Sequence, residues 1–194
     1  MKANPVSVPT GRKHHASSIA VPARGTTRRS LQRKREMPPP YLGNCLCGQV
    51  QFRLCAEPLT YYACHCTDCQ RRTGGAMRLA MWVARSSLQV LAGEPKLLEF
   101  QGSSGRPRRS RACAVCDTRL WAEPADRPSL AVLFPGTLQQ ASHFKPVAHV
   151  WVRSALPWVT IPEGVATFET QPDDPRELIR LWQAAHGSAG QAAS

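Results

Sequence analysis

Short stretches of alternating apolar and polar residues begin near residue 41 and recur along the chain. The first contains Val50, Phe52 and Leu54 at every second position, which is the period of a half-buried strand. Further short strands are predicted over residues 79–84, 88–91, 130–134 and 148–152, and over 96–101, where the alternation is weak. Turn residues such as Gly93 and Pro95 separate these segments. The pattern therefore predicts a mainly β fold of short strands.

One helix is predicted, near the C-terminus. Asp174 is suited to cap it, Pro175 fits the first helical position, and Glu177 stands where a capping box would need it. The apolar positions that follow lie on one helical face: Leu178, Leu181, Trp182 and Ala185. Gly187 can end the helix. We expect this face to pack on the core.

The positive charge of the chain is concentrated at its start. The net charge is +12, and residues 1–40 contain nine Lys or Arg against one acid, Glu36. This segment is poor in aromatic and periodic apolar residues, so it cannot offset the entropy lost on ordering. We expect residues 1–40 to be a disordered basic extension, residues 41–170 to form the folded domain, and residues 171–194 to form the C-terminal helix and tail.

Three explanations of the basic extension remain open. It could be an arm that binds nucleic acid, an organelle transit peptide, or upstream sequence preceding a true start at Met37. We favour the third. The chain has no apolar run of the roughly 18–20 residues that a membrane span needs, and no secretory signal is visible. We therefore expect a soluble cytoplasmic protein with no membrane partner, whose core does not bind nucleic acid.

Seven of the eight cysteines fall into three tight groups. Without an export signal, metal binding is a better explanation for them than disulfides. Cys45 and Cys47 form one pair, and Cys113 and Cys116 form another. Neither pair can complete a tetrahedral zinc site, but together they supply the four thiolates of a structural site. Such a site would join two segments about 70 residues apart.

The middle group supplies only three thiolates: Cys64, Cys66 and Cys69. Three protein ligands and one exchangeable position are typical of catalytic zinc. The sequence leaves a fourth ligand open, and the candidates nearby are Cys55, His65 and Asp68. The ring of His65 is expected to point away, because this residue lies between two ligands. Cys55 is expected to be a small, buried or half-buried residue. The cysteines thus predict two zinc ions per chain.

Other metal and redox chemistries fit less well. The chain contains neither the His-x-Glu of zinc deaminases nor the His-Glu-x-x-His of zinc proteases. The pair at Cys113 lacks the βαβ context of a thioredoxin-like motif. Iron–sulfur clusters usually have their four cysteines arranged differently.

With these groups in place, the sequence resembles the glutathione-dependent formaldehyde-activating enzyme family, which includes centromere protein V. The resemblance spans about residues 41–170. Its motifs are Gly43-Asn-Cys-Leu-Cys-Gly48, Cys64-His-Cys-Thr-Asp-Cys-Gln-Arg-Arg-Thr-Gly74, Gly93-Glu-Pro95, the segment 103–116, Phe134-Pro-Gly-Thr-Leu138, His149-Val-Trp-Val-Arg-Ser154 and Pro157-Trp158.

The resemblance implies small curled antiparallel sheets built around two zinc sites. It assigns Cys45, Cys47, Cys113 and Cys116 to a structural metal, and Cys64, Cys66 and Cys69 to a metal that binds the thiol of glutathione. The implied activity is that of a carbon–sulfur lyase, which forms or breaks S-(hydroxymethyl)glutathione from glutathione and formaldehyde. A zinc module that binds thiols or partners without catalysis, and a chromatin-associated protein that uses the basic arm, are the alternatives.

Three further features concern the substrate or depart from the family pattern. Arg71 and Arg72 follow the middle cysteine group and could attract the carboxylates of glutathione or form a solvated turn. Asp117 stands where the family usually has glycine, and aspartate tolerates the left-handed conformation better than most residues. The segment Thr73-Gly-Gly-Ala-Met77 also departs from the family pattern, and this departure bears on which thiol binds.

Overall fold

The computed structural model describes residues 37–187. The predictions for the basic extension, including its disorder and its nucleic-acid role, concern residues 1–40, of which residues 1–36 lie outside this range. Among the described residues, no helix has the length and apolar character needed to cross a membrane.

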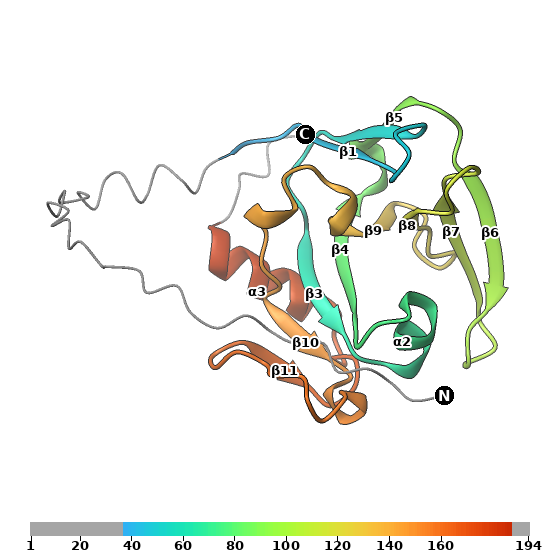
Figure 1. Ribbon diagram of the computed structural model, residues 1–194. Coiled ribbons are helices and arrows are strands. Elements are labelled where there is room, and N and C mark those ends of the chain that lie inside the picture. Colours follow the sequence, from blue (N-terminus) through green and yellow to red (C-terminus); the bar gives the residue numbers. More distant parts are fainter. Residues whose placement is uncertain (1–36, 188–194) are drawn as a thin grey trace, which may run out of the picture. The chain divides into compact units, whose positions relative to one another are not determined.

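A three-stranded antiparallel sheet is formed by the first strands of the described region. It contains β1 (Tyr41–Asn44), β2 (Gln51–Leu54) and β5 (Leu88–Ala92), in the order β1-β2-β5. Phe52 and Leu54 of β2 are fully buried, whereas the alternating Gln51 and Arg53 face solvent. The alternation seen in the sequence therefore reflects one covered and one exposed face of this sheet. In Figure 1, β1 and β5 lie together at the top of the view.

A second sheet has eight strands in the order β11-β10-β3-β4-β9-β8-β7-β6. Most neighbours are antiparallel, but β10 runs parallel to both β3 and β11. Its strands are β3 (Thr60–Cys64), β4 (Arg78–Ala84), β6 (Lys96–Gln101), β7 (Pro107–Ala112), β8 (Arg119–Ala122), β9 (Leu130–Leu133), β10 (Ala148–Val150) and β11 (Ala166–Phe168).

The central strands of the large sheet are buried on both faces. Tyr61 and Met81 belong to a core shared with the small sheet, and Tyr62 and Trp82, one position along, belong to a second core on the opposite face. Trp82 Nε1 donates a 3.1 Å hydrogen bond to the hydroxyl of Tyr62 in this second core. A strand covered on both sides has no polar face, which explains why all five residues of β3 are buried.

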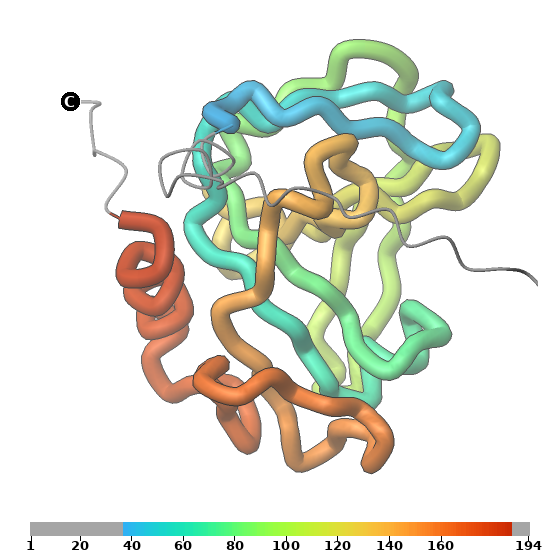
Figure 2. Tube along the Cα trace, turned by 60° about the vertical axis from the view of Figure 1, so that its left-hand side comes forward, coloured from blue at the N-terminus to red at the C-terminus, as the bar shows by residue number. Residues whose placement is uncertain are grey.

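Two α-helices complete the described region. Helix α2 (Thr67–Thr73) follows β3, and α3 (Arg176–His186) lies against β3 (Figure 2). Leu178 and Trp182 of α3 are buried. Asp174 Oδ1 accepts a 2.9 Å hydrogen bond from the backbone N–H of Arg176, as expected of the predicted cap. Thr60 Oγ1 also donates a 2.7 Å hydrogen bond to the carbonyl of Leu178, which joins α3 to the sheet.

The mainly β fold with a C-terminal helix is confirmed. The expectation of small antiparallel sheets describes the three-stranded sheet, but the other sheet is larger and contains two parallel pairs. Parallel pairing is possible because neither pair is joined by a tight hairpin: strands β4 to β9 lie between β3 and β10 in the sequence, and residues 151–165 connect β10 to β11. The short helix α2 and the strands β1, β3, β7, β8 and β11 were not predicted as such from the pattern.

Candidate functional site: two cysteine clusters

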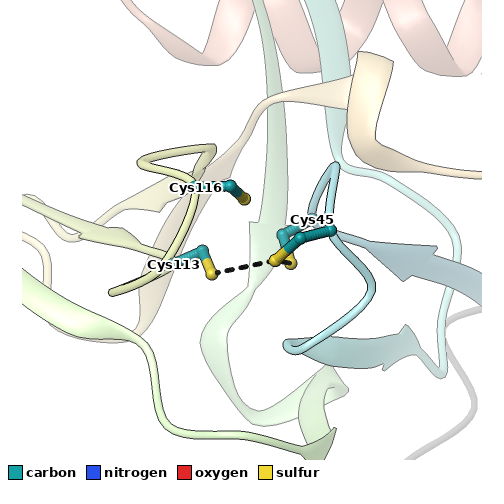
Figure 3. A group of neighbouring side chains, drawn as sticks. Cys45, Cys113 and Cys116 are labelled. Carbon is teal, nitrogen blue, oxygen red and sulfur yellow. Dashed lines mark hydrogen bonds between the residues drawn. The ribbon is translucent and has the colours of Figure 1, made fainter.

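Four cysteines from distant segments meet between the two sheets. Cys45 and Cys47 lie in the turn between β1 and β2, and Cys113 and Cys116 lie in the turn between β7 and β8. Figure 3 shows Cys113 and Cys116 opposite Cys45. All four Sγ atoms lie within 4.8 Å of one another. Cys47 Sγ is 3.5 Å from Cys45 Sγ and 3.7 Å from Cys113 Sγ. These separations are close to the roughly 3.8 Å edge of a tetrahedral zinc–thiolate site.

Hydrogen bonds orient the sulfurs of this cluster. The backbone N–H of Val50 donates to Cys45 Sγ at 3.2 Å, and that of Val115 donates to Cys113 Sγ at 3.4 Å. Such donors partly neutralise thiolates and fix their direction, as outer-shell partners of metal ligands do. Cys45 and Cys47 lie in a tight turn, which is closed by a 3.1 Å hydrogen bond from the N–H of Gly48 to the carbonyl of Cys45.

Thr118 connects the two turns and was not recognised in the sequence. Its Oγ1 accepts a 3.1 Å hydrogen bond from the backbone N–H of Leu46 and lies 3.2 Å from Cys116 Sγ. Hydrogen bonding from Thr118 lowers the pKa of Cys116 to about 5, so this cysteine favours the thiolate form that metals bind. No local pattern marks Thr118, because its partner Leu46 is 72 positions away.

Asp117, which replaces the glycine usual at this point, has a left-handed backbone with φ of 56°. The expectation that aspartate could occupy such a turn is confirmed. Its carboxylate also pairs with Lys96 Nζ at 2.5 Å across to β6.

Asp117→Ala should lower the free energy of unfolding by about 1 kcal/mol, because alanine keeps the β-carbon that is strained at this φ but lacks the polar side chain that lets aspartate tolerate it, whereas Asp117→Gly should change it by less than about 0.5 kcal/mol. Urea denaturation of the metal-loaded proteins measures both. Lys96→Gln is the matched control, since it removes only the exposed ion pair and should be nearly neutral. Equal losses in the alanine and glycine variants would show that the ion pair, rather than the backbone, matters.

The second cluster is formed where β3 passes into α2. β3 ends at Cys64, Cys66 caps α2 and accepts a 3.4 Å hydrogen bond from the N–H of Cys69, and Cys69 follows one helical turn later. Residues three apart in a helix lie on one side, so Cys66 and Cys69 face the end of the strand together. The three Sγ atoms lie within 4.8 Å of one another. Cys64 and Cys69 are buried, and Cys66 is half-buried.

Each candidate for a fourth ligand is occupied elsewhere or lies apart. His65 is fully buried, and its Nε2 lies 2.8 Å from His149 Nδ1. Its Nδ1 is enclosed without a partner in the described structure, but neither ring nitrogen belongs to the group of three sulfurs, as expected. Asp68 Oδ2 accepts hydrogen bonds from both the N–H and the hydroxyl of Ser103. Cys55 is exposed and belongs to neither group. The prediction that Cys55 is buried or half-buried is wrong, because it follows the last residue of β2 and leaves the covered face.

The arginines near the second cluster differ from the sequence expectation. Arg71 is exposed, whereas the guanidinium of Arg72 stacks on Phe100 at 3.3 Å from the ring centroid and donates to Ser110 Oγ at 3.3 Å. Arg72 is therefore not part of a solvated turn. Burial, followed by repulsion from the guanidiniums of Arg119 and others, lowers its pKa to about 10.

Arg78 is a further residue at this cluster that sequence reasoning missed. It lies at the start of β4, directly opposite Cys64 in the antiparallel register with β3. Burial alone lowers the pKa of Arg78, but the charges of Cys69, Tyr62, Cys64 and Cys66 outweigh it, and the net shift is upward. The position of Arg78 next to the cluster follows from the pairing of β3 with β4, and no sequence motif indicates it.

Both clusters have the donor set and spacing of a metal site. One group offers four thiol sulfurs and the other offers three, and both could bind a metal ion. Backbone N–H groups already point at sulfurs in each cluster, which suits thiolates better than neutral thiols. The two groups differ in number of ligands, as the sequence suggested.

The chain was compared with known proteins. The comparison with curated proteins gives no match. Among solved structures, a crystal structure of a Rhodobacter sphaeroides protein matches with a TM-score of 0.40 and 19% identity, over 66% of this chain and 98% of that one. The family assignment does not rest on that likeness. A family model described as glutathione-dependent formaldehyde-activating enzyme matches residues 40–154, which contain both cysteine clusters. The chain therefore belongs to the glutathione-dependent formaldehyde-activating enzyme family.

Proposed function

We propose that this protein is a zinc-dependent enzyme of the carbon–sulfur lyase type that acts on glutathione, or a similar thiol, and formaldehyde. In the synthetic direction the sulfur of the thiol forms a bond to the carbonyl carbon, the carbon–oxygen π bond breaks, and the thiol proton ends on the oxygen. The product is S-(hydroxymethyl)glutathione, and the lyase direction is the reverse. Family membership supports the choice of substrates.

The observation that carries the proposal is the difference between the two clusters. Cys45, Cys47, Cys113 and Cys116 would fill the coordination of a structural zinc, whereas Cys64, Cys66 and Cys69 would leave one position open. His65 and Asp68 have other partners, and Cys55 lies outside both groups, so none of these neighbours closes the second site in the described structure.

Zinc at the second cluster would supply a Lewis-acidic position at which a thiol is held in its nucleophilic, deprotonated form near neutral pH. The protein's own residues would orient the reaction. Cys66 caps α2 and Cys69 lies in its first turn, so the helix fixes two of the three ligands. The half-buried site limits water around the reacting sulfur. All seven sulfurs must be reduced for this function, which suits a cytoplasmic location.

Glutathione should bind the zinc-loaded protein at least about tenfold more tightly than S-methylglutathione, because a thioether cannot become a thiolate. Isothermal titration calorimetry on both ligands measures the difference. The two ligands share the same carboxylates and backbone, so contacts made by the peptide part cancel in the comparison. Equal affinities would contradict a thiolate-binding metal.

The alternative function is a zinc module that binds thiols without catalysis. The rate of adduct exchange distinguishes this module from the proposed enzyme. Exchange between glutathione and its hydroxymethyl adduct, followed by NMR, should run faster with the wild type than with Cys69→Ser. If both proteins give the uncatalysed exchange rate while the wild type still binds glutathione, the protein is a non-catalytic zinc module.

A further inference from the structure

Arg78 occupies an unusual place for a charged residue. It lies on β4 opposite Cys64 of β3, so the two Cβ atoms are about 4.5–5.5 Å apart on the same face of the sheet. Cys64 belongs to the three-cysteine cluster, and β4 also contacts α2, which Cys66 caps and which contains Cys69. The side chain is half-buried, and its Nε is enclosed without a hydrogen-bond partner in the described structure.

No carboxylate in the described region pairs with Arg78. Three other arginines on the large sheet and at its edge show the contrast, because each has a glutamate partner: Arg109 with Glu99, and Arg85 and Arg111 with Glu123. Within residues 37–187, the guanidiniums of Arg72 and Arg119 near Arg78 also have no carboxylate partner. Asp68 on α2 is the acidic side chain at this cluster, and it accepts hydrogen bonds from Ser103 instead of pairing with an arginine. Guanidiniums therefore outnumber carboxylates around the second cluster.

A purely structural role explains this arrangement less well. The guanidinium of Arg78 lies 5.7 Å from the ring centroid of Phe134, which is a modest cation–π contact. A charge that is partly withdrawn from water and left unpaired costs free energy that such a contact does not repay. Arg78 is paired across the strands with Cys64, a member of the three-cysteine cluster. The negative charge of the thiolates would balance the positive charge of Arg78.

The charges of the site then decide which ligand it prefers. Three thiolates and a divalent metal ion together carry one net negative charge, so a fourth, anionic ligand adds negative charge to a centre that is already negative. A neutral donor has no such penalty. Unless a positive group is close by, a three-thiolate site should therefore disfavour a substrate thiolate.

We propose that Arg78 determines ligand specificity at the second cluster: its unpaired guanidinium makes the open position favour an anionic thiolate over a neutral donor. The inference deepens the proposed function and depends on it only for the identity of the thiol as glutathione. Arg78 is thereby a specificity-determining residue, distinct from the metal ligands.

Ligand binding to the cobalt-loaded protein tests this role without measuring turnover. The absorption of cobalt at the second cluster should change when its fourth ligand changes, whereas the four-thiolate site is already complete. Glutathione, 2-mercaptoethanol and imidazole are titrated at pH 7.5, where imidazole is mostly neutral. The variants are Arg78→Gln and Arg78→Lys, with Arg109→Gln as the control, since Arg109 is exposed and paired with Glu99.

Arg78→Gln should weaken the binding of both thiols by roughly 10- to 100-fold and change the affinity for imidazole by less than about threefold. Arg78→Lys, which keeps the charge, should retain most of the thiol affinity, and Arg109→Gln should match the wild type. If Arg78→Gln weakened the binding of all three ligands equally, Arg78 would have a structural role and the proposal would be overturned. If Arg78→Gln does not fold, Arg78→Lys decides: loss of thiol preference in a folded lysine variant overturns the proposal, and its retention supports it.

The two proposals fail in different ways. If 2-mercaptoethanol binds with the expected dependence on Arg78 but glutathione does not bind, the inference holds and glutathione is the wrong substrate. If glutathione binds the wild type and Arg78→Gln equally well, the proposed function stands and the inference fails. If neither thiol alters the cobalt spectrum of the wild type, both are wrong.

Discussion

Cys113→Ser should destabilise the folded protein by more than about 4 kcal/mol and release one metal ion. Cys113 is buried in the four-cysteine cluster, where its Sγ lies 3.7 Å from that of Cys47, 66 positions away in the sequence. The cluster joins the β1–β2 turn of the small sheet to the β7–β8 turn of the large one. Structural zinc in comparable peptides binds with about 10–16 kcal/mol, which is as large as the total stability of a typical domain.

Cys55→Ser is the matched control for this prediction. Cys55 is an exposed cysteine that belongs to neither cluster, so the same chemical change there should alter stability by less than about 0.5 kcal/mol. Urea denaturation followed by circular dichroism, with metal content measured on the same samples, compares the two variants. If Cys113→Ser were as stable as Cys55→Ser, the four-cysteine cluster would not stabilise the fold.

Cys69→Ser should have the opposite profile: a folded protein that has lost the second metal ion and catalyses no exchange above the uncatalysed rate. Its stability should fall by less than about 2 kcal/mol, because other contacts hold α2 in place. Gln70 Nε2 donates to the carbonyls of His65 and Ser154 at 2.9 and 2.7 Å, and Asp68 accepts two hydrogen bonds from Ser103. The helix therefore does not depend on the metal alone.

The comparison of Cys69→Ser with Cys113→Ser tests the assignment of roles. Thermal unfolding and metal analysis of both variants should show a large loss of stability in one and a small loss in the other, with one metal ion missing from each. Equal destabilisation would mean that both clusters are structural, and retention of catalysed exchange by Cys69→Ser would place the reaction elsewhere.

Strands with alternating polarity or a continuous apolar run could be predicted from the sequence, including β6, β4 and β9, whereas β3 and β7 could not. Residues 96–101 were predicted as a strand and form β6 with the same bounds, because β6 alternates between half-buried and exposed positions. β3 has no polar face, so its Thr-Tyr-Tyr-Ala-Cys sequence has no period to detect. β7 was missed for another reason: Arg108 and Arg109 give it a polar character typical of a loop.

The cysteine groups were visible because metal ligands with short spacing carry their own signal. The residues around them were not visible, because tertiary pairing brings them there. Arg78 reaches the second cluster through the β3–β4 register, and Thr118 reaches the first through a hydrogen bond to Leu46. Spacing therefore predicts which sulfurs gather, whereas the charges and hydrogen bonds that tune them follow only from the fold.

The metal content of the protein tests the central claim, that two cysteine clusters with unequal numbers of ligands each hold a zinc ion. Elemental analysis should be made on protein purified under reducing conditions without a chelator, alongside Cys69→Ser and Cys55→Ser. We predict two zinc ions per chain in the wild type and in Cys55→Ser, and one in Cys69→Ser. Iron in place of zinc, or a metal-free wild type whose cysteines are paired as disulfides, would contradict the account.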